Sequence, residues 1–133
     1  MNLSGKVAIV SGAAQGLGRA FAVRLEGEGC KGLGFDVKKG VLEVPGITSM
    51  IADVSKREDV ERIVAKAISM GEIAVLVNNA GTWRKTPVDS PWERALEDWD
   101  FIMDTNLKGV MMLSRKVVPF LQKNGGHIIN LST

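Results

Sequence analysis

The chain has 133 residues, of which 45% are hydrophobic and 24% are charged, a composition typical of one globular domain. Its 17 basic and 15 acidic residues give a net charge of +2 and form no basic tract, which argues against nucleic acid or an anionic membrane as a partner. One cysteine excludes a disulfide framework within the chain, no metal site is predicted, and no apolar run approaches the length of a bilayer span, so we expect a cytoplasmic protein.

Short apolar runs alternate with helical patterns from the start of the chain. Residues 7–10 predict a strand buried on both faces, and apolar residues at helical spacing then predict a helix that ends near Gly29. Residues 32–36 predict a second strand, weakened by its glycines, and residues 49–52 predict a short third strand. Residues 37–47 are expected to be mostly connection.

The next helix has the strongest local signal. Ser55 and Glu58 fit a capping box, in which a serine hydroxyl and a glutamate each satisfy a free backbone N–H. From Val60, apolar residues at i, i+3, i+4, i+7 and i+8 form one stripe, and Gly71 ends the helix. Residues 73–77 predict another fully buried strand.

The last third of the chain is expected to hold one loop, one long helix and one strand. Residues 82–97 are polar and contain Pro87 and Pro91, so they predict a loop that includes about one helical turn. A helix is expected over residues 98–123, bent or interrupted at Pro119. One face of this helix is predicted to consist of Leu107, Val110, Met111, Ser114, Val117, Val118 and Leu121. Residues 127–132 predict the final strand.

This alternation predicts an α/β fold. We expect a Rossmann-type three-layer sandwich around a parallel sheet of about five strands, in the order 3-2-1-4-5. Ligands of such sheets bind at the carboxyl ends of the strands, and the chain's unusual residues follow those ends. They are Ser11, Gly12, Asp36, Asp53, residues 78–81 and residues 132–133.

A glycine-rich turn joins the first strand to the first helix, with the sequence Gly12-Ala13-Ala14-Gln15-Gly16-Leu17-Gly18. Glycines let the backbone approach a pyrophosphate, and the helix N-terminus directs free N–H groups at it. The spacing differs from G-x-G-x-x-G, because Phe21 takes the place of the last glycine. A glycine-rich turn without a ligand is the alternative, but the flanking strand and helix favour phosphate binding.

Polar residues also follow the next three strands. Asp36 stands where a carboxylate accepts hydrogen bonds from an adenosine ribose and repels a 2′-phosphate; a solvated loop residue is the alternative. Asp53 can accept from an adenine amino group or serve as an acid at the N-terminus of the following helix. In residues 78–81, two asparagines can tie strand ends together and Ala-Gly leaves room for a flat ligand, although an ordinary turn has the same composition.

Several other residues could take part in binding or catalysis, but each also has a simpler structural interpretation. Three tryptophans either line a substrate mouth or pack a loop onto the sheet: Trp83, Trp92 and Trp99. His127 is expected at the surface, and Cys30 as a small buried side chain. Four acids are expected to form a solvated helix face rather than a metal site: Glu93, Glu97, Asp98 and Asp100.

Taken together, the motifs resemble the N-terminal part of a short-chain dehydrogenase/reductase. Residues 11–18 are similar to that family's T-G-x-x-x-G-I/L-G, with serine in place of threonine. Asp53-Val54, residues 78–81 and residues 106–109 match its later motifs in order, and residues 129–133 resemble the strand that delivers its catalytic serine. The resemblance covers the whole chain.

The resemblance implies one NAD(P)-binding Rossmann domain over residues 1–133, incomplete at its C-terminal end. It implies hydride transfer between a nicotinamide and a small-molecule alcohol or carbonyl substrate, with NAD favoured over NADP, and a homo-oligomer. By position, the pyrophosphate side would be held by Gly12, Gln15, Gly16, Leu17 and Gly18. Asp36 would bind the adenosine ribose, Asp53 and Val54 the adenine, and Asn79, Ala80 and Gly81 the nicotinamide-side ribose region.

The resemblance also implies the catalytic residues. Asn106 matches the asparagine that supports a water in the proton relay; otherwise it would be a kink or cap residue. The family's serine falls on Thr133, whose hydroxyl can donate to a substrate oxygen. The family's Tyr-x-x-x-Lys pair has no counterpart, because the 133 residues contain no tyrosine. Proton transfer of that kind is worth about 10²–10⁴-fold in rate.

Three interpretations therefore stay open. The chain is an N-terminal portion of an NAD-dependent oxidoreductase, a non-catalytic dinucleotide-binding module such as a shorter isoform or pseudoenzyme, or the product of a gene that continues after Thr133. In each case we expect the 133 residues alone to be inactive as a dehydrogenase.

Overall fold

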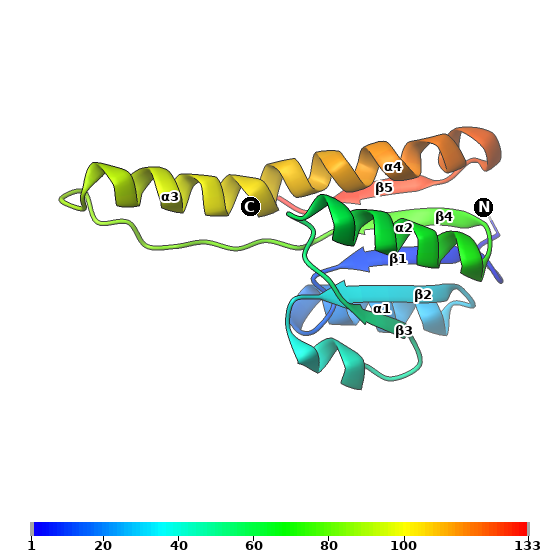
Figure 1. Ribbon diagram of the computed structural model, residues 1–133. Coiled ribbons are helices and arrows are strands. Elements are labelled where there is room, and N and C mark those ends of the chain that lie inside the picture. The colour runs from blue at the N-terminus through cyan, green and yellow to red at the C-terminus, as the bar shows by residue number, and fades with distance from the viewer. Residues whose placement is uncertain (1, 133) are drawn as a thin grey trace.

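The computed structural model describes residues 2–132, which fold around one sheet of five parallel strands (Figure 1). The strands are β1 (Val7–Ser11), β2 (Lys31–Asp36), β3 (Thr48–Ile51), β4 (Ile73–Asn78) and β5 (His127–Asn130). Their order in the sheet is β3-β2-β1-β4-β5. The predicted α/β class and strand order are confirmed, and all five carboxyl ends meet at one edge because every pairing is parallel.

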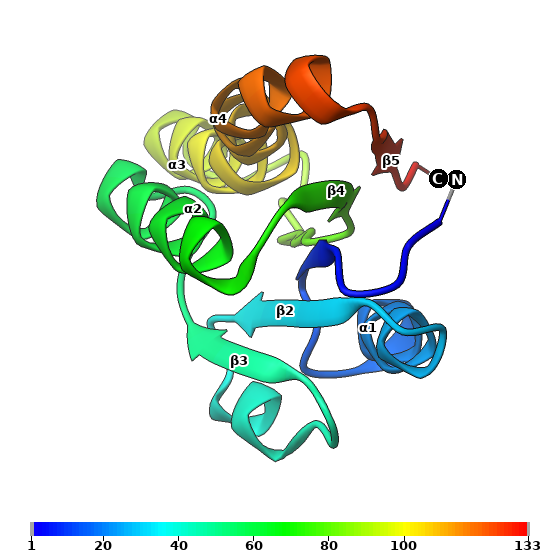
Figure 2. The ribbon, with the colours of Figure 1, turned by 90° about the vertical axis from the view of Figure 1, so that its right-hand side faces the viewer.

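Helices cover both faces of the sheet (Figure 2). One face packs against α1 (Gly16–Gly27), and the other against α2 (Arg57–Met70) and α4 (Gly109–Asn124). A short 3-10 helix, Lys39–Glu43, lies in the segment that was expected to be mostly connection. Within residues 2–132, no helix has the length and apolar character needed to cross a membrane.

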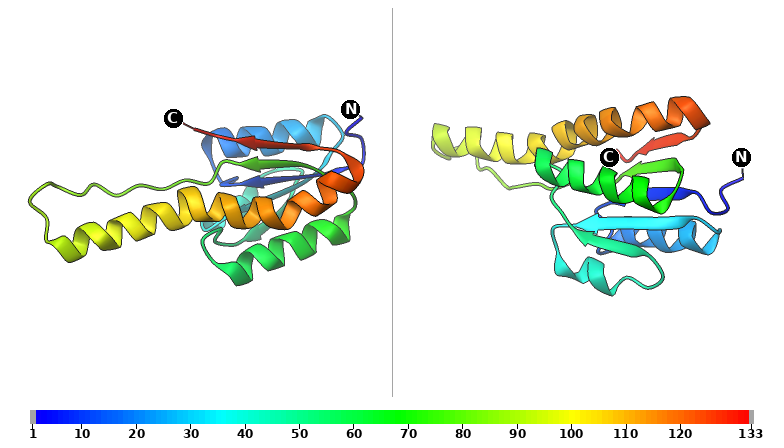
Figure 3. Two further views of the ribbon diagram at one scale, coloured as in Figure 1. Left: turned by 90° about the horizontal axis from the view of Figure 1, so that it is seen from above. Right: turned by 45° about the vertical axis from the view of Figure 1, so that its right-hand side comes forward.

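The predicted helix over residues 98–123 is wrong in its start and in the position of its break. Helix α3 begins at Trp92, directly after Pro91, and runs to Met103, so six residues of the expected loop, 92–97, are helical. A π-helical segment, Asp104–Lys108, then connects α3 to α4, and α4 passes through Pro119 without ending. Helix α3 projects beyond the carboxyl ends of the strands (Figures 1 and 3).

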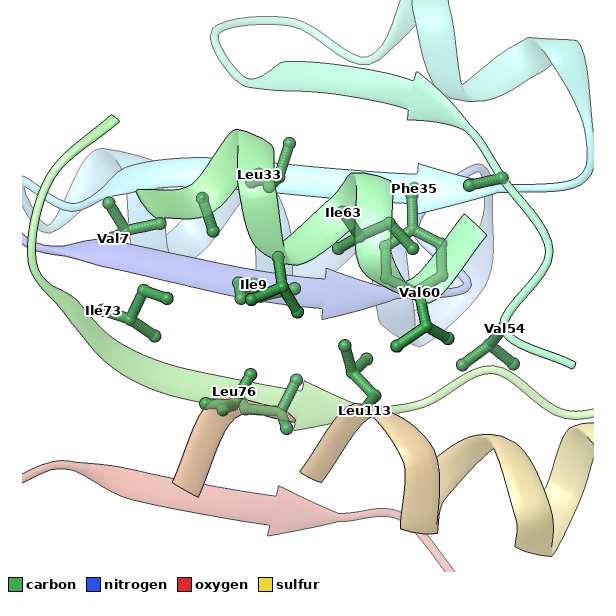
Figure 4. Packing of buried hydrophobic residues seen from close by; sticks show 14 residues of the cluster. Val7, Ile9, Leu33, Phe35, Val54, Val60, Ile63, Ile73, Leu76 and Leu113 are labelled. Atoms are coloured by element: carbon green, nitrogen blue, oxygen red, sulfur yellow. The ribbon is translucent and has the colours of Figure 1, made fainter. Parts of the chain in front are cut away.

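Strand β1 lies between two apolar clusters and is buried along its whole length. Its Val7 and Ile9 belong to the cluster under α2 and α4, whereas Ala8 and Val10 belong to the cluster under α1. Figure 4 shows the first cluster, in which Ile63 of α2 and Leu113 of α4 lie over the strands. Burial on both faces explains why the sequence shows a continuous apolar run here instead of an alternating one.

The buried face of α4 matches the predicted stripe only in part: Val117 is fully buried and Leu121 packs against the core, as predicted. Leu107 and Met111 are 64% and 52% exposed, and the side that meets the core carries Gly109, Leu113 and Val117 at spacings of four residues. Leu107 lies in the π-helical turn, which adds a residue before α4, so Leu107 is out of phase with the buried side of the helix that follows.

The predicted capping box is also wrong. Helix α2 starts after Lys56, and no side chain caps it. The Ser55 hydroxyl instead donates to Asp53 Oδ1 at 2.6 Å, and the backbone N–H of Asp53 donates to Asp59 Oδ2 at 2.8 Å. Because the helix begins later than predicted, the carboxylate that reaches back belongs to Asp59 and not to Glu58.

We expect Leu113→Ala to lower the free energy of unfolding by about 2–5 kcal/mol, because it removes a fully buried side chain between α4 and the sheet. Leu107→Ala is the matched control and should change it by less than about 0.5 kcal/mol, since Leu107 faces solvent. Urea unfolding followed by circular dichroism measures both. Equal losses for the two variants would contradict the observed phase of α4.

Candidate functional site

The buried hydroxyl of Ser11 joins the carboxyl ends of β1 and β4. Ser11 Oγ accepts hydrogen bonds from the backbone N–H groups of Asn79 and Ala80, both at 2.9 Å, and donates to the carbonyl oxygen of Val77 at 3.4 Å. A serine hydroxyl has one proton and two lone pairs, so its hydrogen-bonding capacity is filled. The sequence placed Ser11 at a strand end and as a substitute for threonine, but it did not predict these hydrogen bonds.

The side chain of Asn79 links the end of β4 to the glycine-rich turn. Its Nδ2 donates to the carbonyl oxygens of Ser11 at 3.2 Å and Gly12 at 3.1 Å. Gly12 has a φ of +67°, and a Cβ there would lie 2.9 Å from Asn79 Nδ2. Asn79 therefore fixes the shape of the turn through these two bonds.

The other two glycines of the turn have different roles. A Cβ on Gly18 would overlap the Gly12 carbonyl and the Asn79 amide, so this glycine allows α1 to pack against the turn. A Cβ on Gly16 would meet no protein atom within 4 Å, although the residue has a φ of +58°. The space over Gly16 is open, as a pyrophosphate would require.

An open cleft of about 560 Å³ lies along the carboxyl edge of the sheet. All the predicted cofactor residues line it except Leu17, which is 63% exposed, and Gly18. The cleft also contains residues that the sequence did not single out: Phe35, Val37, Lys38, Ala52, Thr82, Phe101 and Thr105. Phe35, Val37 and Ala52 could have been found as neighbours of strand ends, but Phe101 and Thr105 reach the cleft only through the path of α3.

Asp36 is held in the cleft by backbone donors. Its Oδ2 accepts from the N–H of Ala14 at 3.0 Å and its Oδ1 from the N–H of Lys38 at 3.1 Å. The first bond links the end of β2 to the glycine-rich turn. The carboxylate thus has a fixed orientation between the turn and the cleft.

Asp53 and Val54 lie farther along the same wall. Asp53 Oδ1 accepts from the N–H and the hydroxyl of Ser55, which leaves no bond to Oδ2 among the described residues. Val54 packs under α4, because a Cβ on Gly109 would lie only 2.7 Å from Val54 Cγ1. The local turn at Asp53 is compatible with both the adenine role and the helix-start role.

Asn106 lies in the π-helical segment and holds the loop that follows β4. Its Oδ1 accepts from the N–H of Thr82 at 2.8 Å, and its Nδ2 donates to the carbonyl oxygen of Thr82 at 2.9 Å. Both polar atoms of the side-chain amide are thereby engaged with one peptide segment beside Gly81. The residue is more than a kink in a helix, because it positions a wall of the cleft.

A polar network fixes the end of β5. Asn78 Nδ2 donates to Asn130 Oδ1 at 2.9 Å and to Ser114 Oγ at 3.0 Å, so one amide connects β4, β5 and α4. The prediction that an asparagine ties strand ends together is confirmed. Thr133, predicted as a substrate-contacting residue, lies outside the described residues.

The predicted solvated face of α3 is correct for Glu93, Glu97 and Asp100, which are exposed, but two other expectations for α3 and the loop before it are wrong. Asp98 does not belong to a solvated face: it is 5% exposed and accepts a hydrogen bond from the Thr86 hydroxyl at 2.6 Å. That bond, together with nearby Arg84 and Arg94, holds the pKa of Asp98 below its usual value. The tryptophans do not pack a loop onto the sheet either, because Trp83, Trp92 and Trp99 are 74%, 72% and 62% exposed.

The simpler explanations hold for the two remaining candidates. His127 is exposed at the start of β5. Cys30 is buried, and burial raises the pKa of its thiol, so it is a packing residue without thiolate character.

This arrangement of turn, carboxylate and asparagine can be compared with known proteins. A profile of the short chain dehydrogenase family matches residues 6–133. The chain belongs to this family. It is 35% identical to the 3-oxoacyl-(acyl-carrier-protein) reductase of Thermotoga maritima, with 100% of this chain and 57% of the relative covered. It is 32% identical to the 2-dehydro-3-deoxy-D-gluconate 5-dehydrogenase of Escherichia coli, with 99% and 55% covered.

A solved structure supports the same assignment. The crystal structure of 3-ketoacyl-(acyl-carrier-protein) reductase from Brucella melitensis complexed with NADH matches with a TM-score of 0.87 and 33% identity, over 98% of this chain and 58% of that one. This member of the short chain dehydrogenase family therefore spans a little more than half the length of the relatives it matches.

The different roles of Gly16 and Gly18 predict different phenotypes. Gly16→Val should abolish NADH binding with little change in far-UV circular dichroism, because its side chain enters the open space over the turn. Gly5→Val is the matched control: Gly5 has a φ of +75° and is also open, so it shares the backbone strain of about 1–2 kcal/mol but lies outside the cleft.

Gly18→Ala should instead lower the free energy of unfolding by about 1–3 kcal/mol, as expected for overpacking. Isothermal titration with NADH and urea unfolding distinguish the two effects. If Gly16→Val left the NADH affinity unchanged, the glycine-rich turn would not be a pyrophosphate-binding turn.

Proposed function

We propose that the chain binds NAD(H) along the carboxyl edge of its sheet and forms the cofactor-binding part of a short-chain oxidoreductase. The observation that carries this proposal is the shape of the cleft: a glycine-rich turn with open space over Gly16, and a fixed carboxylate, Asp36, on the same wall. The residues fit a dinucleotide, because helix α1 begins at the open glycine and directs its free N–H groups there.

Each part of the cleft would have one task. Gly12, Gln15 and Gly16 would hold the pyrophosphate, and Asp36 would accept hydrogen bonds from the adenosine ribose. Asn79 would act indirectly by shaping the turn, while Ala80 and Gly81 would leave space on the nicotinamide side. The bound cofactor would supply or accept a hydride, and the substrate would be a small-molecule alcohol or carbonyl compound. Asn106 would hold the Thr82 segment and orient a water for proton transfer.

Asp36 predicts a preference for NAD over NADP, because a fixed carboxylate repels a 2′-phosphate. We expect the 133-residue chain to bind NADH more tightly than NADPH, and Asp36→Ala to reduce the ratio of the two affinities about five- to tenfold. Fluorescence titration of both cofactors measures this ratio. Lys39→Ala is a control, since it changes a charge next to the Asp36 segment without removing the carboxylate. Tighter binding of NADPH by the unchanged chain would contradict the assignment.

The absence of tyrosine predicts that the 133-residue species lacks dehydrogenase activity of the family type. The family resemblance implies a tyrosine as the general acid/base, and no residue of the chain is of that type. We expect no turnover of NAD with a panel of secondary alcohols when the mass of the protein is verified. Clear turnover that Asn106→Ala abolishes would contradict this expectation and require another proton donor.

A non-catalytic dinucleotide-binding module is the second candidate function. Residues 12–105 supply the lining of the proposed cofactor cleft, whereas the 133 residues contain no tyrosine to act as the family's general acid/base. Tight NADH binding by this chain, with no turnover by any longer form of the protein, would support this candidate over the oxidoreductase.

We also propose that a second copy of the chain covers the outer side of α3. This helix buries an acid, Asp98, toward its own loop and turns Trp92, Leu96 and Trp99 toward solvent at helical spacing, the reverse of an ordinary surface helix. A contiguous exposed apolar surface of this kind marks an interaction site.

The charges on α3 also fit a groove on the same chain. Exposed acids flank the apolar side of α3, whereas the groove of about 590 Å³ between α2 and α4 has an apolar floor that contains Met111 and Met112. Its basic residues are Arg57, Arg115 and Lys116. In the proposed dimer, α3 of each copy packs against the groove of the other copy, so that the acids of α3 face the basic residues of the groove.

We expect size-exclusion chromatography with light scattering to detect a dimer at micromolar concentration, and Leu96→Glu to shift it to a monomer by placing a charge in the apolar contact. Trp83→Gln is the control, because Trp83 is also an exposed apolar residue but lies in the loop before α3. A wild-type chain that stays monomeric at a concentration of about 50 µM, which is on the order of the dissociation constant of a weak dimer, would contradict the interface.

A further inference from the structure

The loop between β4 and α3 depends on side chains for its position. Residues 83–86 form no backbone–backbone hydrogen bond with the rest of the described chain. One anchor of this loop is the pair of bonds between Asn106 and Thr82. A second anchor lies farther along the loop, at the buried carboxylate of Asp98.

Asp98 collects partners from both the loop and the helix. Thr86 Oγ1 donates to Asp98 Oδ2 at 2.6 Å, and Arg84 Nη1 donates to Oδ1 at 3.4 Å. Arg94, one turn earlier in α3, places its Nε 3.7 Å from Oδ2. A buried carboxylate without partners would be strongly destabilising, so these groups account for its burial in a helix that otherwise projects into solvent.

Arg84 makes a second contact that leads to the cleft. Its guanidinium carbon lies 3.5 Å from the centroid of the Phe101 ring. Phe101 follows Asp98 by three residues, which places both side chains on the same side of α3. Phe101 also lines the cofactor cleft, next to Thr82 and Thr105. A continuous series of contacts therefore runs from Asp98 through Arg84 to an aromatic wall of the cleft.

We propose that Asp98 is a positioning residue that holds Arg84 against Phe101 and thereby fixes the Phe101 ring as a preformed wall for a heterocycle of the bound dinucleotide. This inference rests on the proposed NAD(H) binding. One side of the ring is occupied by the guanidinium, so the ring presents its remaining surface to the cleft. Planar heterocycles bind aromatic side chains by offset-stacked or edge contacts, which require a ring held in one orientation.

The charge state of Asp98 suits this role. The Thr86 hydrogen bond, Arg94 and Arg84 together hold the pKa of Asp98 below its usual value of about 4. Because the pKa in the folded protein lies below that of the unfolded chain, the stabilisation from the ionised carboxylate is present at neutral pH and is lost only as the pH falls through the folded value. The contact to Arg84 therefore persists across the physiological range.

The test measures NADH affinity and the mobility of the loop in the same variants of the 133-residue chain. Asp98→Asn, Arg84→Met and Phe101→Leu should each weaken NADH binding about three- to tenfold, as expected for loss of one ordered aromatic contact. The double variant Arg84→Met/Phe101→Leu should be no weaker than Phe101→Leu alone, because both changes remove the same contact. Phe101→Tyr keeps the ring and should restore affinity to within about twofold of the wild type.

A matched control removes one negative charge beside Asp98 without touching the network. Glu97→Gln changes an exposed acid of the same helix and should leave NADH affinity unchanged. Hydrogen exchange of residues 82–88 without cofactor should rise in Asp98→Asn and Arg84→Met but not in Glu97→Gln. Urea unfolding of each variant separates these local effects from a global loss of stability.

The outcomes distinguish this inference from the proposed function. A wild-type chain that does not bind NADH overturns both. A wild-type chain that binds NADH, with Asp98→Asn binding equally well, overturns only the positioning role and leaves Asp98 as an anchor of the loop. Additive losses in the double variant would also overturn it, because Arg84 would then act on the cofactor independently of Phe101.

Discussion

The hydrogen bonds between Ser11 and Asn79 are the constraint on which the rest of this molecule depends. One buried hydroxyl accepts from two consecutive backbone N–H groups at the end of β4, and one amide returns two bonds to the end of β1. Neither strand end can move without breaking several partly buried hydrogen bonds, and leaving such groups unpaired costs free energy. The glycine-rich turn and the Ala80-Gly81 segment are therefore fixed relative to each other before any ligand arrives.

The cleft extends from this junction by the same means. Asp36 bonds to the N–H of Ala14, which links β2 to the turn, and Asn78 bonds to Asn130, which links β4 to β5. Asp36 and Asn78 thus satisfy a backbone N–H group and a side-chain amide that follow or belong to the neighbouring strand. A parallel sheet leaves such groups unpaired at its carboxyl edge, and this chain uses them to build a rigid surface with one open position over Gly16.

The projecting part of the chain follows another principle. Helix α3 meets the body mainly through the π-helical segment, and the loop before it is anchored at Thr82 and at Asp98. Its buried residue is an acid and its exposed residues include tryptophans, so its stability within this chain comes from a polar network. On the outer side of α3, Trp92, Leu96 and Trp99 stay exposed, and basic residues line the groove between α2 and α4.

The sequence by itself determined the fold class, the strand order and most of the residues along the cleft. These features follow from local patterns: apolar runs buried on both faces, glycines at a strand–helix turn, and polar residues directly after strands. The family resemblance of residues 11–18 and 78–81 carried the same information, and the match over residues 6–133 agrees with it.

Only the tertiary structure decided the features that join distant segments. The π-helical turn at Asp104–Lys108 puts Leu107 out of phase with α4, so that Leu113 is buried and Leu107 exposed. The burial of Asp98 depends on Thr86 and Arg84, and the presence of Phe101 in the cleft depends on the path of α3. A local pattern reports the period of one segment, whereas the partners of a buried carboxylate and the phase of a helix are set by groups that become neighbours only when the chain folds.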